Sequence, residues 1–323
     1  MTITRLLVLG IAALLLWLGN ALLRPFQTLP QPAQMTCLPE TGSRRPLGAP
    51  ATVYGLGLSF AGHIAESPGL YDPETGPPVF VKRPRTVLGG DVVRMPATAD
   101  LLAAAAELDT AHAAELGAAF ETIPALLDYE VEVGLVVLSP FETARLGDPA
   151  FVPPLGYFVA NDVTARILIA MAPDVGRIVE YLAAGKSLPG FLPAGSTAWI
   201  PDAATPDAGP CVRLVTEVNG ERRQDASFTD IILTPKQILA EVARQQHLTA
   251  FAAHDWIITG TPPGVAAQVP AWQQRLMVLL DPPATLKVRL MAGAAANPRY
   301  LRPGDRVTVS AGHLGTRTIR IEG

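Results

Sequence analysis

Short apolar runs interrupted by proline and glycine fill the chain after residue 50, and this pattern limits the possible folds most. The 323 residues include 31 prolines and 28 glycines. Both residue types break regular structure, so they predict many turns and short strands rather than a helical bundle. The runs that we expect to form strands are residues 53–54, 131–138, 212–218, 256–259 and 306–310.

Local signals add a hairpin and a few helices to this β-rich pattern. Asn219-Gly220 follows one apolar run and predicts a hairpin turn. Residues 99–120 are rich in alanine, residues 235–247 place apolar side chains at helical spacing, and residues 174–184 form a shorter helical candidate. Strands and helices do not alternate regularly, which favours a mixed, β-rich α+β fold over a parallel doubly wound sheet.

Composition and charge restrict the class of partner. Hydrophobic residues make up 49% of the chain, charged residues 17%, and the formal net charge is -4. The sequence has no long basic run, which argues against nucleic-acid binding. Glycine-rich phosphate-binding motifs are also absent, so nothing in the sequence supports a nucleotide cofactor.

Two cysteines, Cys37 and Cys211, stand far apart without a CxxC pair, so we do not expect a cysteine-ligated zinc site. We interpret them as two unpaired thiols. A single disulfide is the alternative if the domain lies outside the cytoplasm.

The N-terminal segment is apolar. Residues 6–23 carry no charge and are long enough for a bilayer core, which predicts a single membrane anchor within residues 1–24. A cleaved signal peptide and a buried helix are the alternatives. Basic residues stand on both sides of the run, so the sequence does not specify the side of the membrane. The proline-rich residues 25–50 predict an extended linker to a catalytic domain over residues 51–323.

Paired acidic residues suggest a metal site. Glu130 and Glu132 are two apart beside an apolar run, so on a strand both carboxylates project from one face. Such a pair is costly unless a cation neutralises it, and oxygen ligands suit Mg²⁺ or Mn²⁺, with Ca²⁺ possible. Asp162, after another apolar stretch, is a candidate third ligand. The alternatives are a solvated strand face for the glutamates and a helix N-cap for Asp162.

Further polar residues could bind or activate a substrate. His63 and Glu66 would share one face of a helix, and a histidine oriented by a carboxylate suits a general base that activates water. Lys82 and Lys186 are candidates for binding a carboxylate or enolate oxygen, and Thr261 stands in a sharp loop that could face an anion. The alternatives are an ordinary histidine beside a surface glutamate and solvated lysines.

Eight segments, in order, resemble the fumarylacetoacetate hydrolase family. They are GLGLSFAGHIAE, PPVFVKRP, LDYEVEVGLVV, GYFVANDVTAR, GKSLPGF, VNGERRQ, DWIITGTPPGV and LRPGDRVTV, within residues 51–323. The resemblance implies a β-roll with a pseudo-barrel and a few peripheral helices, usually in a homodimer.

The resemblance also implies roles for individual residues. It implies Mg²⁺ or Mn²⁺ held by Glu130, Glu132 and Asp162. It implies catalysis by His63, Glu66 and Lys186, and substrate binding by Lys82, Arg166 and Thr261. Substrates of the family are 2-oxo and β-diketo acids. We therefore predict a hydrolase that cleaves a C–C bond in an acylpyruvate-like acid. The alternatives are an isomerase or decarboxylase on the same site, or a non-catalytic membrane-tethered binding protein.

Departures from the family pattern concern the surroundings of the site. Ile167 stands where many members carry an acidic residue, and Leu188-Pro189 stands where an aspartate is usual. Residues 99–125 and 266–300 look like insertions. We expect the first insertion to be helical and to lie near the site entrance, since it leads directly into Glu130.

Overall fold

Two β-sheets form the centre of the molecule in the computed structural model, which describes residues 29–67, 71–268 and 270–323. The larger sheet has the strand order β2-β11-β9-β7-β16-β3-β4, and all its neighbours are antiparallel except β16 and β3. Its strands are, in that order, Gly42–Pro46, Thr197–Pro201, Leu155–Asn161, Val131–Val137, Trp256–Ile258, Val53–Leu56 and Val79–Lys82.

The smaller sheet packs against the larger one and has the order β14-β13-β17-β18-β5. Its strands are, in that order, Glu221–Ser227, Arg213–Val218, Arg306–Ala311, Thr316–Glu322 and Val92–Arg94. Three short pairs complete the β-structure: β1 (Thr36–Cys37) with β12 (Ala208–Gly209), β6 (Leu127–Asp128) with β10 (Thr164–Ala165), and β8 (Phe141–Glu142) with β15 (Ala250–Phe251). The prediction of a mixed, β-rich α+β fold is confirmed.

Strand β7 lies at the centre of the larger sheet, and all its residues are buried. Val131 and Val133 belong to the same core cluster as Leu214 and Val309 of the smaller sheet. On the other face, a Cβ at Gly134 would lie 2.2 Å from the ring of Phe158 on β9, so only glycine fits this position. Burial on both faces explains why the run around residues 131–138 is almost continuously apolar.

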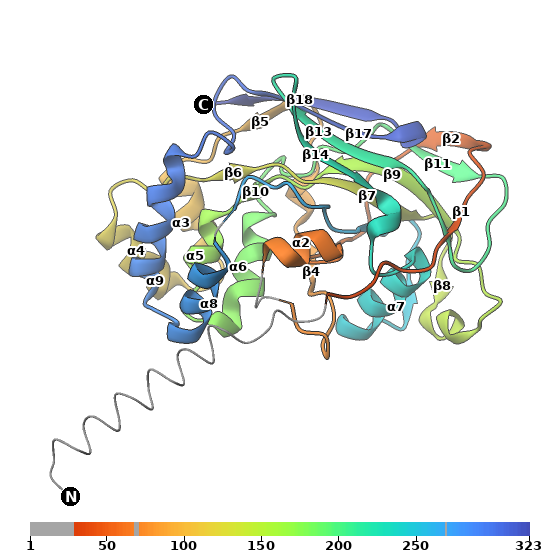
Figure 1. Ribbon diagram of the computed structural model, residues 1–323, viewed down its shortest axis with the longest axis horizontal. Helices are drawn as coiled ribbons and strands as arrows, with labels where there is room; N and C mark the ends of the chain where they lie inside the picture. The colour runs from red at the N-terminus through yellow and green to blue at the C-terminus, as the bar shows by residue number, and fades with distance from the viewer. Residues whose placement is uncertain (1–28, 68–70, 269) are drawn as a thin grey trace, which may run out of the picture.

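Helices surround the sheets. They are α2 (Ala61–Glu66), α3 (Thr98–Ala106), α4 (Thr110–Ala119), α5 (Ile167–Ala170), α6 (Ile178–Gly185), α7 (Pro235–Gln245), α8 (Ala271–Leu280) and α9 (Ala284–Ala292). Short 3₁₀ turns occupy Pro84–Thr86, Thr143–Gly147, Val175–Arg177, Phe228–Asp230, Gly293–Ala296 and Gly312–Leu314. Figure 1 shows α3, α4, α5, α6, α8 and α9 gathered at one end of the sheets and α7 at the other.

The predicted turn and helices are confirmed, with one change. Asn219 and Gly220 both have positive φ and join β13 to β14 in a hairpin. Thr234 caps α7, where the side chain accepts a hydrogen bond from the Gln237 N–H. Residues 99–120 form two helices rather than one, because Asp109 caps a new helix by accepting from the His112 N–H.

The described part of the proline-rich segment is attached to the sheets. β1 pairs with β12 and β2 pairs with β11, and Leu38 and Leu47 are buried. Cys37 and Cys211 form a disulfide with their Cα atoms 5.3 Å apart. The interpretation of two unpaired thiols is therefore wrong, because the pairing of β1 with β12 brings Cys37 beside the start of β13.

No helix within the described ranges is long and apolar enough to cross a membrane. The expectation of a membrane-anchored protein is therefore corrected. The apolar residues 6–23, on which that expectation depended, lie outside the described residues.

Candidate functional site

Three acidic side chains converge where β7 and β9 lie side by side. Glu130 directly precedes β7, Glu132 is within it, and Asp162 follows β9. The Asp162 N–H donates to the Glu130 carbonyl oxygen at 2.8 Å, which fixes the two segments against each other. One carboxylate oxygen of each residue lies within 4.8 Å of the other two, and all three residues are buried.

This triad fits a hard divalent cation. Glu132 Oε2 accepts from the Gly260 N–H at 2.6 Å, whereas Glu132 Oε1 has no hydrogen-bond partner among the described residues. Burial raises the pKa of Glu132 well above its usual value, and Asp162 raises it further. A buried carboxylate oxygen without a partner, beside two other carboxylates, is what a Mg²⁺ or Mn²⁺ site requires.

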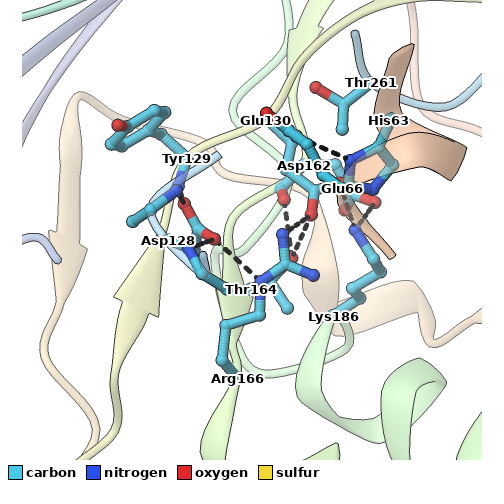
Figure 2. A network of polar contacts seen from close by, with 12 residues as sticks. His63, Glu66, Asp128, Tyr129, Glu130, Asp162, Thr164, Arg166, Lys186 and Thr261 are labelled. Atoms are coloured by element: carbon cyan, nitrogen blue, oxygen red, sulfur yellow. Dashed lines mark hydrogen bonds and ion pairs between the residues drawn. The ribbon is translucent and has the colours of Figure 1, made fainter. Parts of the chain in front are cut away.

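Buried cations surround the triad on its other sides. Lys186 Nζ donates to Glu130 Oε2 at 2.6 Å and to Asp162 Oδ2 at 2.8 Å, and Lys82 also pairs with Asp162. Figure 2 shows Lys186 and Arg166 pointing at the carboxylates from different elements. Although burial opposes both shifts, the pKa of Glu130 is held at about 2 by Lys186 and Arg166, and Asp162 and Glu130 raise the pKa of Lys186. These two carboxylates therefore favour the protonated form of Lys186.

The His63–Glu66 pair stands on the short helix α2 beside the triad. His63 Nδ1 lies 3.4 Å from Glu66 Oε2, and Glu66 also accepts from the Gly264 N–H at 2.9 Å. The predicted i, i+3 arrangement on a helix is present, and the loop after β16 holds the carboxylate in place.

A cavity of about 220 Å³ connects these groups. Of the predicted site residues, it is lined by His63, Glu130, Lys186, Arg166 and Thr261. Other predicted residues are bonded to this lining. Asp162 pairs with Lys186 and with Lys82, and Glu66 pairs with His63. Glu132 completes the triad. The structure thus brings all nine predicted residues to one place.

Two residues that organise the site were missed. Buried Asp128 accepts from Arg166 Nε at 2.8 Å and from the Ala266 N–H at 2.8 Å. Buried Gln224 accepts from the Val131 N–H at 3.0 Å and donates to Thr261 Oγ1 at 2.8 Å. Asp128 carries a signal that could have found it, because it continues the two-residue spacing of Glu130 and Glu132. Gln224 ends the VNGERRQ segment of the family resemblance, but its bonds to Val131 and Thr261 depend on strand pairing that no local pattern specifies.

The two insertions have different relations to the site. No residue of α3 or α4 is among the described residues that line the cavity or the one beside it, so the expected position at the entrance stays a prediction. Leu101 and Leu116 of these helices are instead fully buried in a hydrophobic core that also contains Ala170 and packs against Met291, two residues of the adjoining cavity's lining. Met277 of α8 and Met291 of α9, in the second insertion, line the adjoining cavity.

The departures at Ile167 and Leu188 fall outside the cavity. Both side chains are buried in the core that holds α3 and α4, and neither lines the cavity. They change the packing behind the site rather than its polar groups.

Known bacterial proteins have sequences related to this chain. Oxaloacetate tautomerase YisK of Bacillus subtilis is 25% identical over 289 residues, which cover 89% of this chain and 75% of that protein. An uncharacterised protein of Staphylococcus epidermidis is 31% identical over 198 residues. These residues cover 60% of this chain and 52% of the Staphylococcus protein.

Solved structures share the fold. A candidate fumarylpyruvate hydrolase from Burkholderia cenocepacia has a TM-score of 0.54 at 20% identity, covering 93% of this chain and 98% of that one. A protein from Mycobacterium abscessus assigned as a 2-hydroxyhepta-2,4-diene-1,7-dioate isomerase has a TM-score of 0.54 at 24% identity, covering 86% and 78%. The family model described as fumarylacetoacetate (FAA) hydrolase C-terminal matches residues 52–322. This chain therefore belongs to the fumarylacetoacetate hydrolase family.

Proposed function

We propose that the protein is a divalent-metal-dependent hydrolase that cleaves a C–C bond in a small 2-oxo acid of the acylpyruvate type. The proposal is carried by one observation: Glu130 of the acidic triad and His63 of the His63–Glu66 pair line the same cavity. Glu130, Glu132 and Asp162 would hold Mg²⁺ or Mn²⁺, and a 2-oxo carboxylate offers oxygen ligands to such a cation. When bound, the cation supplies Lewis-acid stabilisation of negative charge on substrate oxygens.

The protein's own groups would carry the proton transfers. His63 Nδ1 faces Glu66, so Nε2 would accept a proton from water. The hydroxide attacks the distal carbonyl carbon, and the bond between that carbon and the pyruvate methylene breaks. The products are a carboxylic acid and the enolate of pyruvate, whose carbon takes the proton back from His63. One water is consumed, and no electron donor or acceptor is needed.

The cations would neutralise the charge that develops on oxygen. Lys186, whose pKa Asp162 and Glu130 raise against the effect of burial, suits the enolate oxygen. Arg166 and Thr261 line the same cavity and are placed for contact with the substrate. Lys82, paired with Asp162, would fix the orientation of that ligand.

A second candidate is an isomerase, tautomerase or decarboxylase on the same site. It is favoured by the name of the Bacillus relative, an oxaloacetate tautomerase. The same base would then move a proton between carbon and oxygen without attack by water.

Isotope labelling separates these reactions. Wild type, His63→Ala and Glu132→Gln would be incubated with acetylpyruvate and oxaloacetate in H₂¹⁸O, with Mg²⁺ or Mn²⁺. The hydrolase predicts acetate that carries ¹⁸O, and loss of this product in both variants. Keto–enol exchange of oxaloacetate without cleavage of acetylpyruvate would replace the hydrolase with the tautomerase. Absence of metal-dependent turnover of either acid would contradict both reactions.

A further inference from the structure

A second cavity of about 190 Å³ adjoins the first. The two cavities share the lining residues His63, Ser67, Arg166, Ile169, Val175 and Ile178. Because they meet at His63 and Arg166, a substrate held at the triad could extend into the second cavity. We call this second cavity the outer cavity.

Beyond the shared residues, the outer cavity is lined mostly by apolar side chains, and its two further charged residues, Asp281 and Lys287, pair with each other. Val265 and Ala267 come from the loop after β16, Met277 from α8 and Met291 from α9. Figure 1 places α8 and α9 beside α5 and α6, which carry Ile169 and Ile178. Methionine side chains are flexible and polarisable, so they adapt to apolar groups of different shape.

Each cation in the lining of the two cavities already has an acidic or carbonyl partner among the described residues. Arg166 bonds to Asp128 and Glu130, and Lys186 bonds to Glu130 and Asp162. In the outer cavity, Lys287 Nζ lies 3.2 Å from Asp281 Oδ1 and 3.5 Å from the Pro173 carbonyl oxygen. A carboxylate at the far end of a substrate would therefore lose water and meet no unpaired cation among the described lining residues, which is unfavourable.

We propose that the outer cavity is a subsite for an uncharged, apolar tail, so that the substrate is a 2-oxo acid with an alkyl or aryl acyl group. This inference rests on the proposed function for the position of the 2-oxo acid head. The subsite itself is formed by the loop after β16 and the second insertion, whose helices α8 and α9 supply the methionines.

The test compares two ligands of equal length that differ at one end. 2-Oxooctanoate ends in a methyl group, and 2-oxooctanedioate ends in a carboxylate. Calorimetric titration of each into the full chain with Mg²⁺ measures binding without requiring turnover. We expect 2-oxooctanoate to bind about tenfold tighter or more, since the dioate must bury an unpaired charge. Equal affinity, tighter binding of the dioate, or no binding of 2-oxooctanoate would overturn the subsite.

A matched pair of variants places a cation inside or outside the outer cavity. Met291→Lys adds an ammonium to the lining, whereas Leu290→Lys adds one to the neighbouring side chain, which is exposed and is not part of the lining. Met291→Lys should reduce the preference for 2-oxooctanoate severalfold, and Leu290→Lys should leave it unchanged. Thermal melting would verify that both variants fold. If both variants reduced the preference for 2-oxooctanoate equally, the cause would be a general charge effect, and the proposed location of the subsite would be contradicted.

Cleavage of acetylpyruvate by the wild type, measured in parallel, keeps the two proposals apart. If acetylpyruvate is cleaved but 2-oxooctanoate is not preferred over the dioate, the subsite proposal fails and the hydrolase proposal stands. If 2-oxooctanoate is preferred but acetylpyruvate is not cleaved, the subsite proposal stands and the hydrolase proposal fails.

Discussion

The charged end of the site and its apolar end differ in how their side chains are held. Glu130, Glu132 and Asp162 are at most 3% exposed, and the positions of all three are fixed by hydrogen bonds or ion pairs. Met277 and Met291 at the apolar end are only partly buried and contribute no charge. Removing a group from the charged end leaves a buried charge or polar group without its partner, whereas the apolar end can change shape at little cost. Under the proposed function and the proposed subsite, the reaction and the choice of substrate would therefore depend on different parts of the site.

The largest expected effect is at the triad. Glu132→Gln should lower the affinity for Mg²⁺ or Mn²⁺ by about a hundredfold or more, because a ligand is lost, while folding is retained because one of three crowded carboxylates is neutralised. Calorimetric titration of each metal measures the affinity. Glu115→Gln on α4, whose side chain is 77% exposed, is the control. Equal affinity in Glu132→Gln and wild type would contradict the metal site.

The next effect tests the support of the charged end. Asp128→Asn should lower the free energy of unfolding by about 3 kcal/mol, because Arg166 would lose one partner of a buried ion pair. Urea denaturation measures the loss. Asp225→Asn, which removes a pair with the exposed Arg213, should lose far less. A similar loss in the two variants would mean that burial does not set the cost.

A smaller effect follows from the pKa of Glu132, which burial and then Asp162 raise well above the usual value. Metal binds the deprotonated side chain, so affinity should fall by up to about tenfold per pH unit below the raised pKa and be constant above it. In the metal-free protein the sign is opposite, because the stability that protonated Glu132 contributes is lost as the pH rises through the raised pKa. Titrations in buffers of different ionisation enthalpy count the released protons. Metal affinity that does not change with pH from the usual pKa of a glutamate upward would exclude this linkage.

The smallest effect is expected at the apolar end. Met277→Ala should weaken binding of 2-oxooctanoate by about fivefold, since each buried methylene contributes about 0.8 kcal/mol. Metal affinity should be unchanged, because Met277 lines the outer cavity and is not among the described residues that line the first cavity with Glu130. A change in metal affinity as large as the change in ligand affinity would mean that the two ends are coupled.

The sequence predicted the charged end better than the apolar end, for a physical reason. Glu130 and Glu132 are recognisable in the sequence because they are two residues apart beside an apolar run. At the start of the folded strand this spacing places both side chains on one face. The role of α8 and α9 depends on which helices pack beside α5 and α6, which no local pattern specifies. The disulfide was missed for the same reason, since the contact of Cys37 with Cys211 depends on the pairing of β1 with β12.

That disulfide also gives the molecule a covalent topology. It links positions 174 residues apart and closes a ring of chain that contains His63, Lys186 and the three acidic residues, whereas Met277 and Met291 lie outside the ring. A single backbone cut inside the ring leaves the two pieces covalently joined through the sulfur atoms. A cut between Cys211 and α8 instead separates the methionines of the outer cavity from the acidic triad. After a single proteolytic cut, the acidic residues would therefore stay covalently linked within the ring, whereas these methionines could be released from it.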